Sequence, residues 1–88
     1  MTKEEFELIE NVENIPFENG WFGIKYLTLD ENTRVRFGYS FSELGKTYKL
    51  QRKNYFWKSV AWTYDIWHND KLSDTIIYLF WYEERHKK

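Results

Sequence analysis

The sequence alternates between apolar and polar residues most strictly over residues 34–41. Val35, Phe37, Tyr39 and Phe41 occupy one set of positions, and the intervening positions carry arginine, glycine and serine. Because successive side chains of a β-strand point to opposite faces, this period of two predicts a strand with one aromatic face and one basic or small face. A strand of this kind needs neighbours, so we expect the chain to build an antiparallel sheet.

Weaker alternation marks the segments on either side. One segment begins at Trp21 and runs to a polar turn at 30–33, and another runs from Lys46 to Arg52 after a turn at 42–45. Polar turns this short join antiparallel neighbours, whereas parallel strands need a long crossover. The three segments therefore predict a meander.

The first residues predict a helix of about 12 residues, too short to persist unless it packs on the sheet. Thr2 and Glu5 have the spacing of a capping box, and Phe6, Ile9 and Val12 recur at helical spacing. The proline and glycine that follow are expected to end the helix.

The C-terminal part of the chain allows two interpretations. Residues 60–66 and 75–82 are rich in β-branched and aromatic residues, which favours a strand for each. Residues 75–82 are apolar on both faces, however, and the charged tail is typical of a helix end, so the alternative is a helix from Ser73 or Asp74 to His86. With both segments taken as strands, the predicted fold is α+β: one N-terminal helix and about five antiparallel strands in a meander, in a single domain over residues 1–88.

Aromatic residues make up 22% of the sequence, with seven Phe, seven Tyr and five Trp. One short helix cannot cover both faces of a five-stranded sheet, so we expect the sheet to curl into a partial barrel or to leave an aromatic surface for a partner. The alternative is that the aromatic residues fill a small core. Because tryptophan is frequent at the energetic centre of protein interfaces, we select four contact residues. They are Trp57, Trp62, Trp67 and Trp81.

The charges are unevenly distributed along a chain whose net charge is −1. Residues 1–31 carry a net charge of −6 and residues 32–88 a net charge of +5. Two poles of this kind steer a partner or favour head-to-tail contacts between copies, unless they are ordinary solubility devices. The steering charges that we predict are Arg34, Arg36, Arg52 and Lys53.

The same basic and aromatic stretch supports a second hypothesis, a module that binds single-stranded nucleic acid. Such modules combine cations that contact phosphates with aromatic rings on which bases stack. Two features argue against this hypothesis. The net charge is near zero, and in the strand predicted over residues 34–41 the aromatic residues lie on the face opposite the arginines. The residues selected for this function are Lys49, Arg52, Lys53, Tyr55 and Trp57.

Residues suited to catalysis or metal binding are sparse. The chain has no cysteine and two histidines. Its closest approach to a metal cluster, Asp65, His68, Asp70 and Asp74, matches no ligand motif. The serines lie in no nucleophile motif, and the glycines form no phosphate loop. We therefore expect no enzymatic activity, no metal and no cofactor.

The remaining features bear on the compartment and the type of partner. No apolar run reaches the roughly 18–20 residues that cross a bilayer, and the lack of cysteine fits a reducing compartment, so we expect a cytoplasmic protein without a membrane partner. Small cysteine-free proteins of this style are typical of phages and mobile elements, including anti-CRISPR inhibitors of host defence. The leading hypothesis is a non-enzymatic binding protein whose aromatic surface holds another protein or a second copy in a homodimer.

Overall fold

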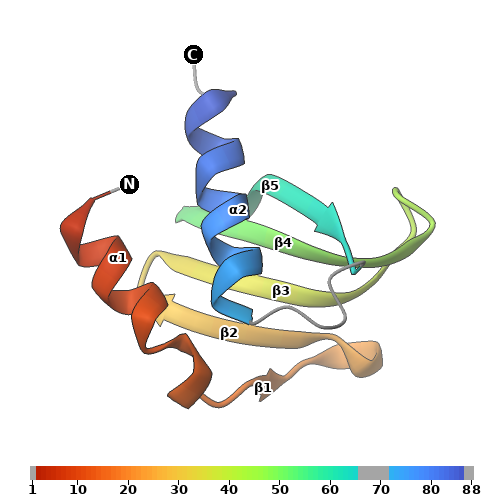
Figure 1. The fold of residues 1–88 in the computed structure, drawn as a ribbon. Helices are drawn as coiled ribbons and strands as arrows, with labels where there is room; N and C mark the ends of the chain where they lie inside the picture. The colour runs from red at the N-terminus through yellow and green to blue at the C-terminus, as the bar shows by residue number, and fades with distance from the viewer. Residues whose placement is uncertain (1, 66–71, 87–88) are drawn as a thin grey trace.

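The computed structural model describes residues 2–65 and 72–86. They form an α+β fold in which two helices lie on one side of a five-stranded antiparallel sheet (Figure 1). The strands follow one another in chain order, as the predicted meander requires. The first and last strands are the two edges, so the sheet stays open and does not close into a partial barrel.

Helical and extended segments alternate along the described chain. The helical elements are α1 (Lys3–Glu10), the short 3₁₀ turns η1 (Val12–Asn14) and η2 (Trp21–Gly23), and α2 (Leu72–Arg85). The strands are β1 (Glu18–Asn19), β2 (Lys25–Asp30), β3 (Thr33–Ser40), β4 (Gly45–Asn54) and β5 (Phe56–Tyr64). Strands β3, β4 and β5 confirm the strands predicted over residues 34–41, 46–52 and 60–66, although β5 begins and ends earlier than expected.

The strand predicted over residues 75–82 is wrong, because this segment belongs to α2. The helical alternative is confirmed. Ile76, Leu79 and Phe80 are buried at helical spacing, whereas Trp81 is half exposed. A helical period of 3.6 residues thus separates the buried side chains from the exposed ones. The period of two of a strand would not separate them.

The strand predicted from Trp21 begins only at Lys25. The preceding residues form a tight turn in which both Phe22 (φ 59°) and Gly23 (φ 76°) have left-handed backbone. Positive φ at two successive positions is typical of turns between antiparallel strands. Here the turn joins β2 to the short strand β1, which completes the five strands of the sheet. The sequence pattern placed residues 18 and 19 of β1 at the end of the first helix.

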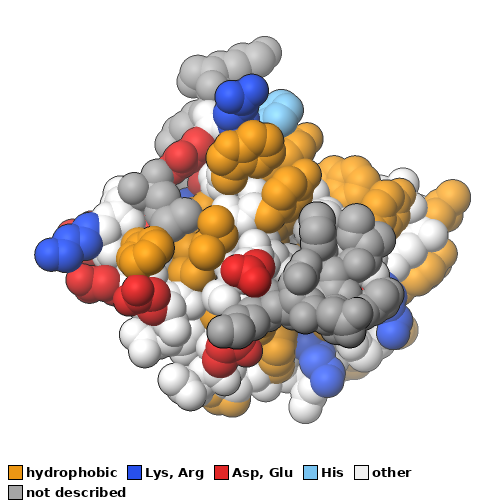
Figure 2. All heavy atoms as spheres, viewed as in Figure 1, with side chains coloured by type: hydrophobic (Ala, Val, Ile, Leu, Met, Phe, Trp, Pro, Cys, Tyr) orange, Lys and Arg blue, Asp and Glu red, His pale blue; other side chains and the backbone are white. Residues whose placement is uncertain are grey.

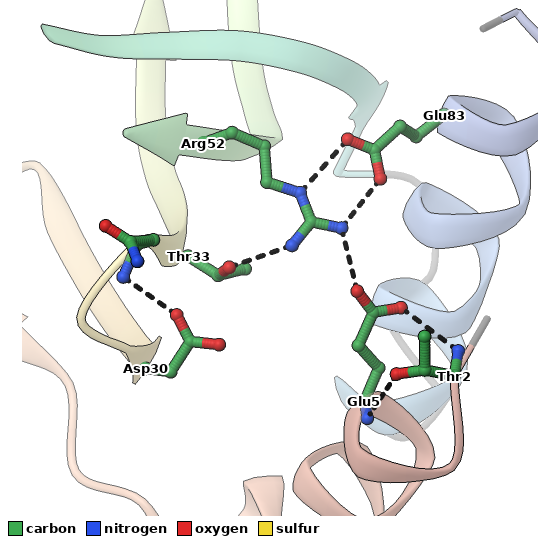
Figure 3. A network of polar contacts seen from close by, with 7 residues as sticks. Thr2, Glu5, Asp30, Thr33, Arg52 and Glu83 are labelled. Carbon is green, nitrogen blue, oxygen red and sulfur yellow. Dashed lines mark hydrogen bonds and ion pairs between the residues drawn. The ribbon is translucent and has the colours of Figure 1, made fainter. Parts of the chain in front are cut away.

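The predicted capping box of α1 is confirmed. The Thr2 hydroxyl accepts the Glu5 N–H at 3.1 Å, and the Glu5 carboxylate accepts the Thr2 N–H at 3.4 Å (Figure 3). The helix is shorter than expected, with 8 residues. Ile9 and Val12 anchor this segment in the core, while Phe6, expected in the same stripe, remains exposed.

The core lies between the helices and one face of the sheet, and it is aliphatic. Leu27, Val35, Leu50 and Ala61 are paired in one row across β2 to β5 and are buried. Among the aromatic residues of the described chain, only Phe80 is buried, and Tyr48, Tyr78 and Tyr82 pack partly buried against the core, so core filling accounts for only part of the aromatic content. The exposed aromatic residues are Phe6, Phe17, Trp21, Phe22, Tyr39, Phe41, Tyr55, Phe56, Trp62, Tyr64 and Trp81.

Arg52 joins the sheet to both helices (Figure 3). Its guanidinium donates to Glu83 of α2 at 2.7 and 3.0 Å, and to Glu5 of α1 at 3.2 Å. A fourth hydrogen bond, to the hydroxyl of Thr33 on β3, measures 2.8 Å. The hydrogen bonds to Glu83 are the main reason why the pKa of Arg52 is raised. The bidentate contact with Glu83 is both strong and directional, and together with the single contact to Glu5 it helps to hold the two helices on this face.

We predict that Arg52→Met lowers the free energy of unfolding by about 2–3 kcal/mol, because it leaves two carboxylates without their cation. Arg52→Lys keeps the charge but loses the bidentate geometry, and we expect it to recover about half of that loss. Urea denaturation measures both changes. The control is Lys46→Met, which removes an exposed charge from the same strand. Equal effects of Arg52→Met and Lys46→Met would contradict the role given to Arg52.

Candidate binding face

The face of the sheet that points away from α1 and α2 is not covered by any described helix. We call it the open face. The strand register places on it the side chains that alternate with the core residues. Its principal members are Tyr26, Arg34, Arg36, Lys49, Gln51, Lys53, Trp57, Ser59, Trp62 and Tyr64.

A β-bulge in β5 determines which tryptophans reach the open face. The register between β4 and β5 skips Val60. An extra residue of this kind shifts the alternation of side chains by one position. Trp57 before the bulge and Trp62 after it therefore share the open face, although the alternation of an unbroken strand would place them on opposite faces.

Arg34 of β3 lies between two aromatic rings, one from the adjacent strand β2 and one from β5. Its guanidinium carbon is 4.0 Å from the ring centre of Tyr26 and 4.2 Å from that of Trp57. Its Nε donates to Gln51 at 2.7 Å, and the Gln51 amide donates to Ser59 at 3.3 Å. Burial is the main cause of the lowered pKa of Arg34. These cation–π and hydrogen-bond contacts tie β2, β3, β4 and β5 together on the open face.

A cleft of about 650 Å³ lies on the open face near the β3–β4 hairpin. Its floor includes Arg36, Lys49 and Gln51 from the strands. Phe22, from the β1–β2 turn, and Phe41, from the β3–β4 loop, line its rim and are 96% and 85% exposed. The cleft thus combines a cationic floor with an aromatic rim.

Gly38 allows the β1–β2 turn to approach this cleft. A Cβ atom at this position would lie 3.2 Å from the Cα and Cγ1 atoms of Ile24. This spacing is tighter than ordinary packing contacts, so a side chain at residue 38 would push the turn away from β3. The absence of a side chain keeps Ile24, and with it Phe22, beside the cleft.

Glu43 reaches from the β3–β4 loop to the cations of the cleft. Its carboxylate is 2.8 Å from Lys49 Nζ, and its backbone carbonyl accepts the Tyr64 hydroxyl at 2.8 Å. The hydrogen bond with Lys49 is the largest cause of the lowered pKa of Glu43, and the charge of Arg36 acts in the same direction. The loop is therefore held against the open face by its own carboxylate.

Arg36 is the less compensated of the two cations in the floor. Its Nη2 donates to the Tyr39 carbonyl at 3.0 Å, while Nη1 is buried and has no hydrogen-bond partner within residues 2–65 and 72–86. A cation without a full set of acceptors in a partly enclosed site raises the positive potential around it. The floor of the cleft should therefore attract an anionic group.

Three bulky residues have left-handed backbone in the turns. They are Phe22 (φ 59°), Leu44 (φ 58°) and Tyr55 (φ 70°), and all three are exposed. This conformation costs about 1–2 kcal/mol per residue for side chains other than glycine. Exposed side chains return little packing energy, so for Phe22 and Leu44, near the cleft, this cost agrees with a role in binding. Phe22 and Leu44 lie at the cleft end of the sheet, and Tyr55 lies at the opposite end.

The structure separates the residues predicted to contact a protein partner. Arg34, Arg36, Lys53, Trp57 and Trp62 lie together on the open face. Arg52 lies on the opposite face, where two carboxylates match its charge. Trp81 belongs to α2, over which Figure 2 shows exposed hydrophobic side chains. Trp67 lies outside the described residues.

The set predicted for nucleic acid is also divided. Lys49, Lys53 and Trp57 lie on the open face, and Tyr55 lies in the β4–β5 turn at its edge. Sequence reasoning missed the contributions of Tyr26, Phe22, Phe41 and Glu43. A local signal existed only for Phe22, because a residue before glycine at a strand boundary is typical of a turn.

The structure also bears on metal binding and membrane insertion. Within the described ranges, no three His, Asp or Glu residues gather as metal ligands would. His68 and Asp70, two of the four residues that come closest to a metal cluster in the sequence, lie outside those ranges. Neither α1 nor α2, nor any other described helix, has the length and apolar character needed to cross a membrane.

Comparisons with protein-family models, with characterised proteins and with solved structures find no match to this chain. The function of the open face is therefore inferred from its side chains alone. They offer cations, exposed aromatic rings and a cleft bounded by both.

We predict that Glu43→Gln lowers the free energy of unfolding at neutral pH by about 1 kcal/mol through loss of the Lys49 contact. A carboxyl whose pKa is lowered on folding stabilises the protein above its ordinary pKa, here 4.5. That contribution disappears as the pH falls through the lowered value. Urea denaturation across this range should show the two proteins converging in acid, with the exposed Glu10→Gln as control. A difference that persists in acid would contradict this cause.

Proposed function

We propose that the protein is a non-enzymatic binding module that holds a protein partner against its open face and the aromatic residues around the cleft. The observation that carries this proposal is that the apolar side chains fall into two groups, with aliphatic ones in the core and most aromatic ones at the surface. Aliphatic residues form the core, while Phe80 is the only aromatic residue buried in the described chain. Aromatic side chains that do not stabilise the fold are available for an interface.

The apolar part of the proposed interface is the cleft end of the sheet. Trp21, Phe22, Phe41 and Leu44 are between 78% and 96% exposed there. Phe41 contacts the ring of Tyr39, with 5.2 Å between ring centres. Clustered exposure of large apolar residues is uncommon on monomers unless a partner covers them, and aromatic residues dominate the binding energy of protein interfaces.

The charged part of the proposed interface lies beside the apolar part. Arg34, Arg36, Lys49 and Lys53 share the open face. The acidic helix α1 lies on the other side of the sheet (Figure 1). Such a separation orients an acidic partner toward the open face during encounter, which increases the association rate and the specificity.

A binding module of this size would act by covering a surface of its partner. The proposal includes a cytoplasmic partner, which the lack of cysteine in the sequence fits. Occlusion of a host protein by a phage or mobile-element product, in the manner of anti-CRISPR proteins, is one form of this function that size and composition suggest. A homodimer formed through the same surface is another.

Single-stranded nucleic acid is the second candidate ligand. The sequence argued against it because the aromatic residues of 34–41 lie opposite the arginines, but other aromatic residues share the face of the arginines. Tyr26 of β2 and Trp57 of β5 lie on the same face as the arginines, so aromatic and basic groups do meet there. However, the Arg34 guanidinium already stacks on both rings, and bases would have to displace it to stack in its place. The protein partner is therefore favoured.

Phe22→Asn tests the proposal, and we expect it not to destabilise the fold. Asparagine accepts left-handed backbone more readily than phenylalanine, so we expect a gain of about 0.5–1 kcal/mol in the free energy of unfolding. We also expect about tenfold weaker binding to sequences that the wild-type protein selects from a random-peptide display library. Tyr55→Asn is the matched control, since it relieves the same strain at the other end of the sheet and should leave binding unchanged.

Several results would count against a protein-binding face. One is a library selection without enrichment, and another is enrichment that Phe22→Asn and Tyr55→Asn weaken equally. Tight binding of labelled oligo(dT) that weakens steeply with salt, measured by fluorescence anisotropy, would favour the second candidate. If light scattering shows a dimer that Phe22→Asn dissociates, the partner is a second copy of the chain.

A further inference from the structure

The arrangement of charge and apolar surface in the cleft indicates what part of a partner it accepts. Arg36 and Lys49 pair with each other across β3 and β4, so their side chains lie side by side in the floor. Gln51 and Ser59 extend this floor with groups that form hydrogen bonds. An anionic group that enters the cleft would meet two cations and neutral polar groups.

Glu43 shows which anion this floor already accommodates. Its carboxylate forms an ion pair with Lys49 at 2.8 Å, and the side chain of Lys49 is only 16% exposed. The β3–β4 loop thus presents one carboxylate to the cations from the side of the hairpin. Arg36 keeps a buried Nη1 without an acceptor in the described part of the chain, so Glu43 does not satisfy both cations.

The rim restricts what can accompany the anion. Phe22 and Phe41 stand on two separate loops, with Ile24 near Phe22, and they border the cationic floor. Aromatic and aliphatic walls favour an apolar group next to the charge, because apolar contact removes water and strengthens the ion pair. A bare phosphate or a uniformly polar chain would leave this rim exposed.

We infer that the cleft binds an acidic side chain of the partner protein, Asp or Glu, together with an adjacent aromatic or aliphatic residue. This inference rests on the proposed function and specifies the partner segment. In the complex, the partner carboxylate pairs with Arg36 and shares Lys49 with Glu43. The neighbouring apolar side chain packs between Phe22 and Phe41.

The sequences enriched from the random-peptide library provide the first test. We expect an Asp or Glu beside an aromatic or aliphatic residue. A synthetic peptide with the commonest enriched sequence, measured by calorimetry, should lose about tenfold in affinity when its acidic residue becomes the amide. Arg36→Met should cause a similar loss, and Arg36→Lys should restore much of it. The matched control, Lys46→Met, should leave the affinity unchanged.

Glu43→Gln tests whether the cleft recognises the charge of the peptide, because a purely apolar cleft would bind the acidic peptide and its amide version equally. Removing the resident carboxylate takes away a repulsive charge and frees Lys49, so the acidic peptide should bind about threefold more tightly or better. The amide version of the peptide should gain little. Equal gains for both peptides would overturn the inference.

The outcomes distinguish failure of this inference from failure of the proposed function. Enriched peptides that depend on Phe22 but lack acidic residues, or that bind Arg36→Met as well as wild type, would overturn the inference and leave the protein-binding face intact. A selection without enrichment would overturn both. Competition by oligo(dT) for the acidic peptide would assign the cations to phosphate binding instead.

Discussion

The position of Arg52 on the helix-facing side of β4 determines how this small protein is layered. A partly buried guanidinium needs acceptors in several directions, and here α1, α2 and β3 each supply one residue. Neither helix is long, with 8 and 14 residues, so each depends on contacts with the sheet. Because this cation and the shared core join both helices to the same face, no helix of the described residues covers the opposite face of the sheet.

The uncovered face has a consequence for the use of aromatic residues. Leucine, isoleucine and valine are the main residues of the single core layer, whereas most aromatic side chains remain partly or largely exposed. On the open face, the contacts of Arg34 with Tyr26 and Trp57 stabilise the central strands. The exposed rings near the hairpin make no comparable contribution to the fold. The two groups of aromatic residues therefore have different roles, and the second group is the basis for an interface.

The turns of the sheet depart from the residues that their geometry favours. Glycine or asparagine is expected at positions with left-handed backbone, yet phenylalanine, leucine and tyrosine occupy them. Local rules of this kind are usually broken where function requires a specific side chain. Two of the three departures lie at the cleft end of the sheet, and one of them, Phe22, lines the cleft. Their location agrees with a binding role for the cleft end of the sheet, which the charges of the floor support independently.

The sequence by itself predicted the class of fold, the capping box and most strands, because these depend on local patterns of side chains. It also located the basic and aromatic residues, but it did not show which of them meet. Residues 75–82 were misread as a strand because their apolar residues fit both periods, and only packing of Ile76, Leu79 and Phe80 against the sheet selects the helix. The contents of the open face were decided by tertiary structure in the same way. The register of β2 and β3 places Tyr26 diagonally across from Arg34, and a bulge at Val60 turns Trp57 and Trp62 to one side. Pairing between strands is a long-range property, and a shift of one residue reverses every side chain beyond it.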